Sequence, residues 1–124
     1  MRDFYFFTKT KVTAEDCFEA LQKEIKNVKM NGDTDIWIDA KSSSFIWLYN
    51  DRIEDYAEDE IEDLKSRIPI VDPYITFFET HRSIDAKRVI KVLMQLYPEL
   101  YINVNDESDW FGTAQEYLDT EFYY

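Results

Sequence analysis

The densest group of chemically capable side chains lies between residues 51 and 63, in the segment DRIEDYAEDEIED. Eight of these thirteen residues carry a carboxylate, and Arg52 is the only base among them. Carboxylates ligate hard metal ions, and a pair of them can divide acid and base roles when one is buried in a cleft. They also form solvated helix faces or attract a basic partner. The rest of the sequence ranks these four interpretations.

Metal binding is poorly supported. An EF-hand loop needs acidic ligands at alternate positions, a glycine at its sharp turn and a final bidentate Glu. The segment 51–63 has no glycine, and NVNDESDWFG, residues 103–112, has a glycine at the wrong spacing. Zinc sites need several Cys or His ligands, and the chain has one of each. We therefore predict no metal site.

Catalytic groups are equally scarce. Cys17 lies on the apolar stripe of a predicted helix, where a buried and inert thiol is expected. The two glycines, Gly32 and Gly112, are isolated and cannot form a phosphate-binding loop. The dense acids fall on the polar side of a predicted helix, which disfavours a carboxylate pair. We predict no enzyme activity, no catalytic residues and no cofactor. A small enzyme or ligand-binding domain that uses His81, the only histidine, remains an alternative.

The net charge of −12 is concentrated in two segments. Residues 51–63 hold eight acids and one base, and residues 92–124 hold seven acids and no base. A field of this sign repels nucleic acids and anionic membranes, and it attracts cationic surfaces. Acidity also serves solubility alone, so a plain solvated surface is the competing interpretation.

Length and composition indicate one globular domain over residues 1–124. Nine Phe, nine Tyr and three Trp supply ample core material. No apolar run approaches the roughly 20 residues that span a bilayer, and the apolar part of the N-terminus is too short for a signal peptide. A single cysteine excludes an intrachain disulfide and favours a reducing, cytoplasmic setting.

The elements that must position these residues follow from hydrophobic spacing and turn residues. We expect strands at residues 2–11, 35–40, 44–50, 73–81 and 99–106. We expect helices at residues 13–29, 53–67 and 84–97, and a last short helix or tail at residues 112–124. The resulting order is β-α-β-β-α-β-α-β-α.

This order predicts an α+β single-domain sandwich, with helices packed on a mixed or antiparallel sheet of about five strands. A doubly wound α/β fold is the alternative. The strands at 35–40 and 44–50 are expected to form an antiparallel hairpin, and the strands at 73–81 and 99–106 a βαβ crossover. Residues 45–49 are apolar on both faces, which suits a central strand or an uncovered aromatic face.

Acids and aromatic rings are interleaved near the C-terminus and in the acidic helix. Aromatic side chains dominate interface hot spots, and carboxylates accept bidentate Arg. The predicted partner-binding residues are therefore Asp55, Glu58, Asp59, Glu62, Asp106, Asp109, Trp110 and Tyr117. We expect Glu58 and Asp109 to pair with Arg or Lys, and Trp110 and Tyr117 to supply buried area.

The chain is small and acidic, it lacks catalytic groups, and residues 97–119 form the run YPELYINVNDESDWFGTAQEYLD. In these features it resembles small acidic α+β bacterial immunity proteins. Those families neutralise toxins of contact-dependent or related interbacterial systems. The resemblance covers about the last third of the chain and includes no diagnostic motif, so no functional residue is transferred. It implies a tight one-to-one complex that blocks the active site of a toxin domain or an adjacent surface.

We therefore expect a non-enzymatic immunity or inhibitor protein that binds a cognate basic toxin domain. A nuclease is one candidate, because nucleases present cationic clefts to their substrates. No direct binding of nucleic acid or membrane is expected. A DNA-mimic regulator is a further alternative. It would need carboxylates spaced like duplex phosphates, about one per 1.7 Å, and hence a dimer.

Overall fold

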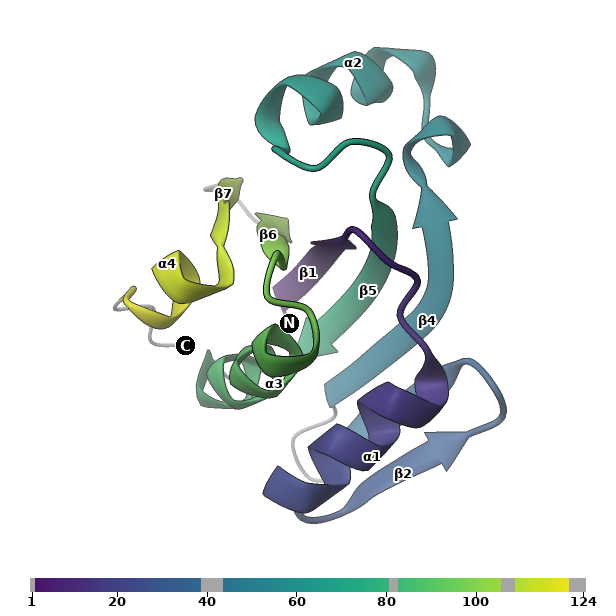
Figure 1. The fold of residues 1–124 in the computed structure, drawn as a ribbon, viewed down its shortest axis with the longest axis vertical. Coiled ribbons are helices and arrows are strands. Elements are labelled where there is room, and N and C mark those ends of the chain that lie inside the picture. The colour runs from purple at the N-terminus through teal and green to yellow at the C-terminus, as the bar shows by residue number, and fades with distance from the viewer. Residues whose placement is uncertain (1, 39–43, 81–82, 106–108, 121–124) are drawn as a thin grey trace.

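The computed structural model describes residues 2–38, 44–80, 83–105 and 109–120 (Figure 1). Within these residues, an antiparallel sheet of seven strands is combined with four α-helices and one 3₁₀ helix, η1. The elements in chain order are β1 Arg2–Thr8, α1 Ala14–Glu24, β2 Val28–Asn31, β3 Asp35–Ile38, β4 Ser44–Arg52, η1 Ile53–Asp55, α2 Glu58–Arg67, β5 Tyr74–Thr80, α3 Ser83–Leu96, β6 Tyr101–Asn105, β7 Trp110–Thr113 and α4 Ala114–Leu118.

The strands lie in the order β2-β3-β4-β5-β1-β6-β7, and every neighbouring pair is antiparallel. β5 and β6 both pair with β1, so they run parallel to each other with β1 between them. Helix α3 therefore connects the two outer strands of a split βαβ unit. The crossover predicted from the sequence is present, with one strand inserted.

The α+β class is confirmed, and the sheet differs from the expected one in size and order. It has seven strands among the described residues, rather than about five, and it is purely antiparallel, which excludes the doubly wound alternative. The expected helix at 13–29 ends at Glu24, because Asn27 adopts a left-handed φ of 63° and the chain turns into β2. Residues 110–113 form β7 before the last helix begins.

The first and last helices are capped by threonine. The Thr13 side chain accepts a hydrogen bond from the Asp16 amide at 3.3 Å, as its position before the helix predicts. Thr113 and Glu116 form a capping box at the start of α4. α2 begins later than expected, because residues 53–55 form the separate turn η1.

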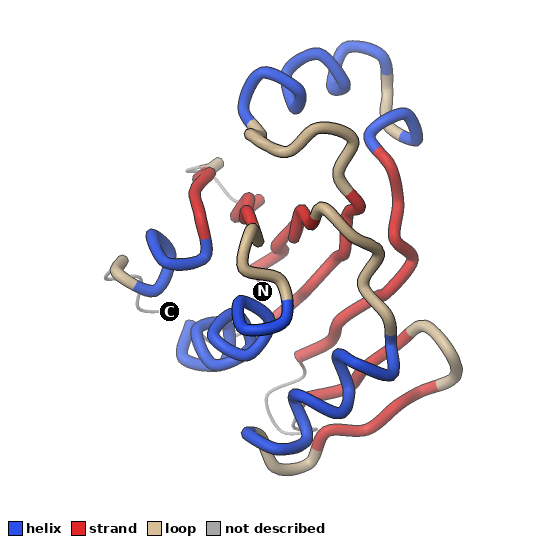
Figure 2. The backbone as a smooth tube through the Cα atoms, in the orientation of Figure 1, coloured by secondary structure: helices blue, strands red, loops and turns tan. Residues whose placement is uncertain are grey.

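Helices α1, α3 and α4 contact one face of the sheet and build the main core with it. Alternate strand residues point into this core, among them the fully buried Phe4, Phe6, Ile46, Phe78 and Ile102. Figure 1 shows α2 apart from these three helices, beyond the ends of β4 and β5. Figure 2 shows the loop that follows α2 running back to the sheet at β5.

A smaller second core lies under α2, on the other face of the sheet. Its buried members are Phe7, Ile53, Ile68 and Ile75, with Ile61 and Leu64 of α2 packed against them. Phe6 and Phe7 are adjacent and therefore point to opposite faces of the sheet. Among the helices in the described residues, α2 and η1 thus cover only one end of this second face.

Candidate functional site

Six aromatic rings form a continuous row across the sheet face that α1, α3 and α4 do not cover. Successive ring centroids lie 5.7, 5.6, 5.1, 5.6 and 6.4 Å apart, and the rings in order are Trp37, Phe45, Trp47, Phe77, Tyr5 and Tyr56. We call these six residues the aromatic row, and the sheet face that carries them the open face.

The row follows from strand register. Phe77 on β5 lies directly opposite Trp47 on β4 and opposite Tyr5 on β1, and Trp37 on β3 lies opposite Phe45. Directly opposite side chains in a sheet are close enough to pack ring against ring. Tyr56 joins the row from outside the sheet, because it is the C-terminal cap of η1.

The open face is exposed along part of its length. Trp37 is 43% exposed and Tyr49, on the same strand as Trp47, is 59% exposed. The other five members of the row are half-buried. Contiguous exposed apolar surface on a protein of this size is typical of an interaction site.

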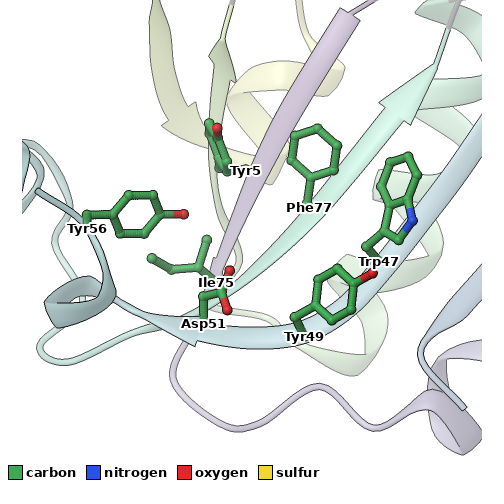
Figure 3. Close-up of a pocket in the computed structure, with 7 residues that line it drawn as sticks. All are labelled: Tyr5, Trp47, Tyr49, Asp51, Tyr56, Ile75 and Phe77. Atoms are coloured by element: carbon green, nitrogen blue, oxygen red, sulfur yellow. The ribbon is translucent and has the colours of Figure 1, made fainter.

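A cavity of about 480 Å³ lies in the middle of this face (Figure 3). Its walls are formed by Tyr5, Trp47, Tyr49, Asp51, Tyr56, Ile75 and Phe77. β4 has an irregular register between Trp47 and Asp51, where Asn50 adopts a left-handed φ of 51°. The Asn50 amide fixes this bulge, because its side chain donates to and accepts from the backbone of Val12, both at 2.9 Å.

A second cavity, of about 290 Å³, lies between α2 and the sheet and shares Tyr5 and Tyr56 with the first. One side of it is held together by Arg67, which pairs with Asp109 at 2.7 Å and with Asp63 at 3.6 Å. The same guanidinium lies 4.3 Å from the ring centroid of Phe111. α2 is thereby connected to the β6–β7 hairpin.

The electrostatic environment of the open face is negative. Burial raises the pKa of Tyr56, and the neighbouring Tyr5, Asp51, Glu60 and Asp55 raise it further. Burial also raises the pKa of Tyr5, with Asp3 and Glu60 adding to it and a hydrogen bond with Asn105 opposing it. The carboxylates are therefore close enough to the two phenols to disfavour their ionisation.

The structure places the predicted acidic residues mostly around α2. The Asp55 carboxylate accepts a hydrogen bond from the Arg52 amide at 2.8 Å and so caps η1. Glu58, Asp59 and Glu62 are exposed on α2. These residues form a solvated acidic surface beside the open face. Asp106 lies outside the described residues.

The predicted C-terminal site residues are dispersed. Asp109 is exposed and engaged by Arg67, and it also accepts a hydrogen bond from Asn103 at 3.1 Å. Trp110 packs on the main core, edge to face with Tyr117, and Tyr117 is completely buried. Tyr117 is therefore a core residue, because α4 packs its ring against the sheet. Its inclusion among the predicted partner-binding residues is corrected accordingly.

The predicted partner-binding residues included none from the open face, although one feature of the sequence pointed to that face. The segment 45–49 is apolar on both strand faces, and this predicted either a central strand or an uncovered aromatic face. β4 is both, since it has neighbours on each side and its Phe45, Trp47 and Tyr49 side chains lie on the open face.

Catalytic and metal candidates remain few in the part of the chain that the structure describes. Cys17 is fully buried, and burial, with a smaller contribution from Asp16, raises the pKa of its thiol to about 12. No group of three or more His, Cys, Asp or Glu side chains in the described ranges is arranged to hold a metal ion. His81 lies outside these ranges.

No helix in the described residues is long and apolar enough to cross a membrane. Comparisons of the chain with family models, with curated proteins and with solved structures each found no match.

Proposed function

We propose that this chain is a non-enzymatic immunity or inhibitor protein that binds a basic protein partner on its open face. The observation that carries the proposal is the uncovered aromatic row with carboxylates around it. Trp and Tyr are enriched among the few residues that carry most of the binding energy at an interface, and surrounding acids speed the approach of a cationic partner.

The charge of the chain selects the class of partner. A second copy of the chain would also carry a net charge of −12, and pairing two open faces would bring like charges together. Nucleic acids and anionic membranes are repelled for the same reason. A protein with a positively charged surface is the occupant that complements both the rings and the carboxylates.

A toxin domain is the specific partner that we propose. Inhibition of a toxin in a one-to-one complex requires a rigid surface and no catalytic groups, and a sheet face supported by a helical layer supplies such a surface. The exposed acids of α2, namely Glu58, Asp59 and Glu62, lie beside the open face and would steer the partner toward it. The resemblance to bacterial immunity proteins supports this setting and a cytoplasmic location.

The experiment is a pull-down from the native host with three baits. The baits are the wild-type chain, Trp47→Ala on the open face, and Gln95→Ala on the exposed side of α3 in the helical layer. We expect the wild-type and Gln95→Ala baits to retain one basic protein that high salt weakens, and the Trp47→Ala bait to lose it. The retained protein should then inhibit growth when it is expressed alone.

Two results would contradict the proposal. One is retention of the same basic protein by all three baits, which would place the interface elsewhere. The other is the absence of any basic protein from the wild-type bait at low salt.

A further inference from the structure

The cavity of about 480 Å³ combines aromatic walls with one carboxylate. Figure 3 shows the side chains of Tyr56, Tyr5, Phe77, Trp47 and Tyr49 around the hollow, with the carboxylate of Asp51 between Tyr56 and Tyr49. The Tyr49 side is open to solvent, because that side chain is 59% exposed. A ligand group can therefore enter from the open face.

The carboxylate of Asp51 has no cationic partner within the described residues, where the ion pairs are those of Arg67 and Arg88. The adjacent Arg52 is directed elsewhere, since its guanidinium donates to the Asp72 carbonyl at 2.9 Å and lies 4.1 Å from the ring centroid of Tyr74. The cavity thus presents a negative group and electron-rich ring faces without a cation between them.

A second place in the same chain shows which group a ring and a carboxylate bind together. At the β6–β7 hairpin, the guanidinium of Arg67 lies over the ring of Phe111 and pairs with the carboxylate of Asp109 at 2.7 Å. Ring and carboxylate there act together on one guanidinium, by cation–π attraction and by a charge-assisted hydrogen bond. The cavity contains the same two kinds of group, with more rings.

We propose that this cavity is the receptor for an arginine side chain presented by the basic partner. The assignment rests on the proposed function, because it names the group by which that partner is recognised. A guanidinium is planar and weakly hydrated, so it stacks on rings while its N–H fork meets a carboxylate. A lysine ammonium is compact and strongly hydrated, and it fits aromatic walls less well.

The volume agrees with this occupant. Pockets that bind small molecules span roughly 300–1,000 Å³, so about 480 Å³ is large enough for a guanidinium with its aliphatic stem. The stem would lie against Ile75 and Phe77, and the fork would reach Asp51.

The test is an NMR titration of the full chain with three probes: N-acetyl-arginine methylamide, its lysine counterpart and its citrulline counterpart. Citrulline has nearly the shape of arginine and no charge. We expect the arginine probe to shift the indole signal of Trp47 in a saturable manner and to leave that of Trp110 in place. The lysine probe should bind more weakly, and the citrulline probe should give no saturable shift.

Two matched variants test whether the Asp51 carboxylate binds the arginine probe. Asp51→Asn should weaken arginine binding by about tenfold, the scale of one lost hydrogen bond between charged groups. Glu19→Gln removes an equal charge from the exposed side of α1, in the helical layer, and should change the affinity by less than about twofold, the effect of one screened charge. Equal responses to arginine and citrulline in the wild-type chain would overturn the assignment, as would equal effects of the two variants.

The outcomes separate this assignment from the proposed function. If Trp47→Ala abolishes capture of the basic partner and the arginine probe does not bind, the protein interface stands and the arginine receptor is wrong. If the arginine probe binds as expected and no basic protein is captured, the chemistry of the cavity stands and the inhibitor function is wrong.

Discussion

The rings of Tyr5 and Tyr56 meet edge to face, with centroids 6.4 Å apart and planes at 89°. Tyr5 belongs to β1 within the sheet, and Tyr56 follows η1 on the path to α2. Both residues line both cavities of the open face. This contact therefore forms a shared wall between the two cavities. It also packs the acidic segment, residues 51–63, against the middle of the sheet.

The two faces of β5 should respond differently to loss of a ring. Phe78 is fully buried under the helices, so Phe78→Ala should lower the free energy of unfolding by about 3–5 kcal/mol. Its neighbour Phe77 is half-buried on the open face, and Phe77→Ala should cost only roughly 1–2 kcal/mol. Urea unfolding measures both values. Equal losses would mean that the open face is covered in the folded chain.

Cys17 should make the chain less stable in alkali. Burial raises the pKa of its thiol from 9.0 to about 12, so the native state keeps the proton at pH values where the unfolded chain loses it. The resulting stabilisation is complete below pH 9.0 and is lost as the pH rises toward about 12.

The variant Cys17→Ala isolates this effect, because Tyr5 and Tyr56 titrate in both proteins. The difference in unfolding free energy between wild type and Cys17→Ala should shrink between pH 9 and pH 12, the interval between the unfolded and folded values. Denaturant titrations at several pH values in that interval measure it. If the difference in unfolding free energy does not depend on pH, burial does not raise the pKa of the Cys17 thiol.

Electrostatic steering by α2 and direct contact by Trp47 should affect different rate constants of binding. Reversing two exposed charges on α2, Glu58→Lys with Glu62→Lys, should slow association with the basic partner by about tenfold and reduce its salt dependence. Trp47→Ala removes a contact and should accelerate dissociation by about 30-fold, the scale of one hot-spot residue. Surface plasmon resonance at two salt concentrations resolves the two rates. An effect of the α2 variant on dissociation alone would place α2 inside the interface.

Gly112 should tolerate no side chain. A Cβ built there would lie 2.6 Å from Cζ2 of Trp110, which folds back over the glycine. Gly112→Ala should destabilise the chain by about 1–3 kcal/mol and alter the near-UV circular dichroism, because the indole has to move. Gln115→Ala, at an exposed position of α4, is the matched control and should change neither quantity. An unchanged spectrum for Gly112→Ala would contradict the packing of Trp110.

The local features of the fold were the most predictable from sequence. Thr13 and the burial of Cys17 followed from helix capping and helical spacing, which depend on neighbours in the chain. β2 was missed because Val28 also continues the helical pattern of α1, and only the left-handed turn at Asn27 redirects the chain. A single residue with positive φ leaves little trace in a hydrophobic pattern.

The candidate site was less predictable, because it depends on which side of the sheet the helices cover. The sequence identified acids and rings that are close along the chain, and it therefore favoured α2 and the C-terminal segment. The aromatic row instead joins residues from four strands and η1, and strand order alone brings Tyr5 beside Phe77. The burial of Tyr117 likewise depends on tertiary packing.

The most direct test of the open face as an interface is hydroxyl-radical footprinting of the chain, free and in complex with the basic protein that the pull-down recovers. Trp37 and Tyr49 are exposed on the open face, whereas Val71 and Leu96 are exposed elsewhere, in the loop after α2 and at the end of α3. We predict that binding protects Trp37 and Tyr49 from oxidation and leaves Val71 and Leu96 unchanged. Protection of Leu96 with continued oxidation of Trp37 and Tyr49 would contradict the account.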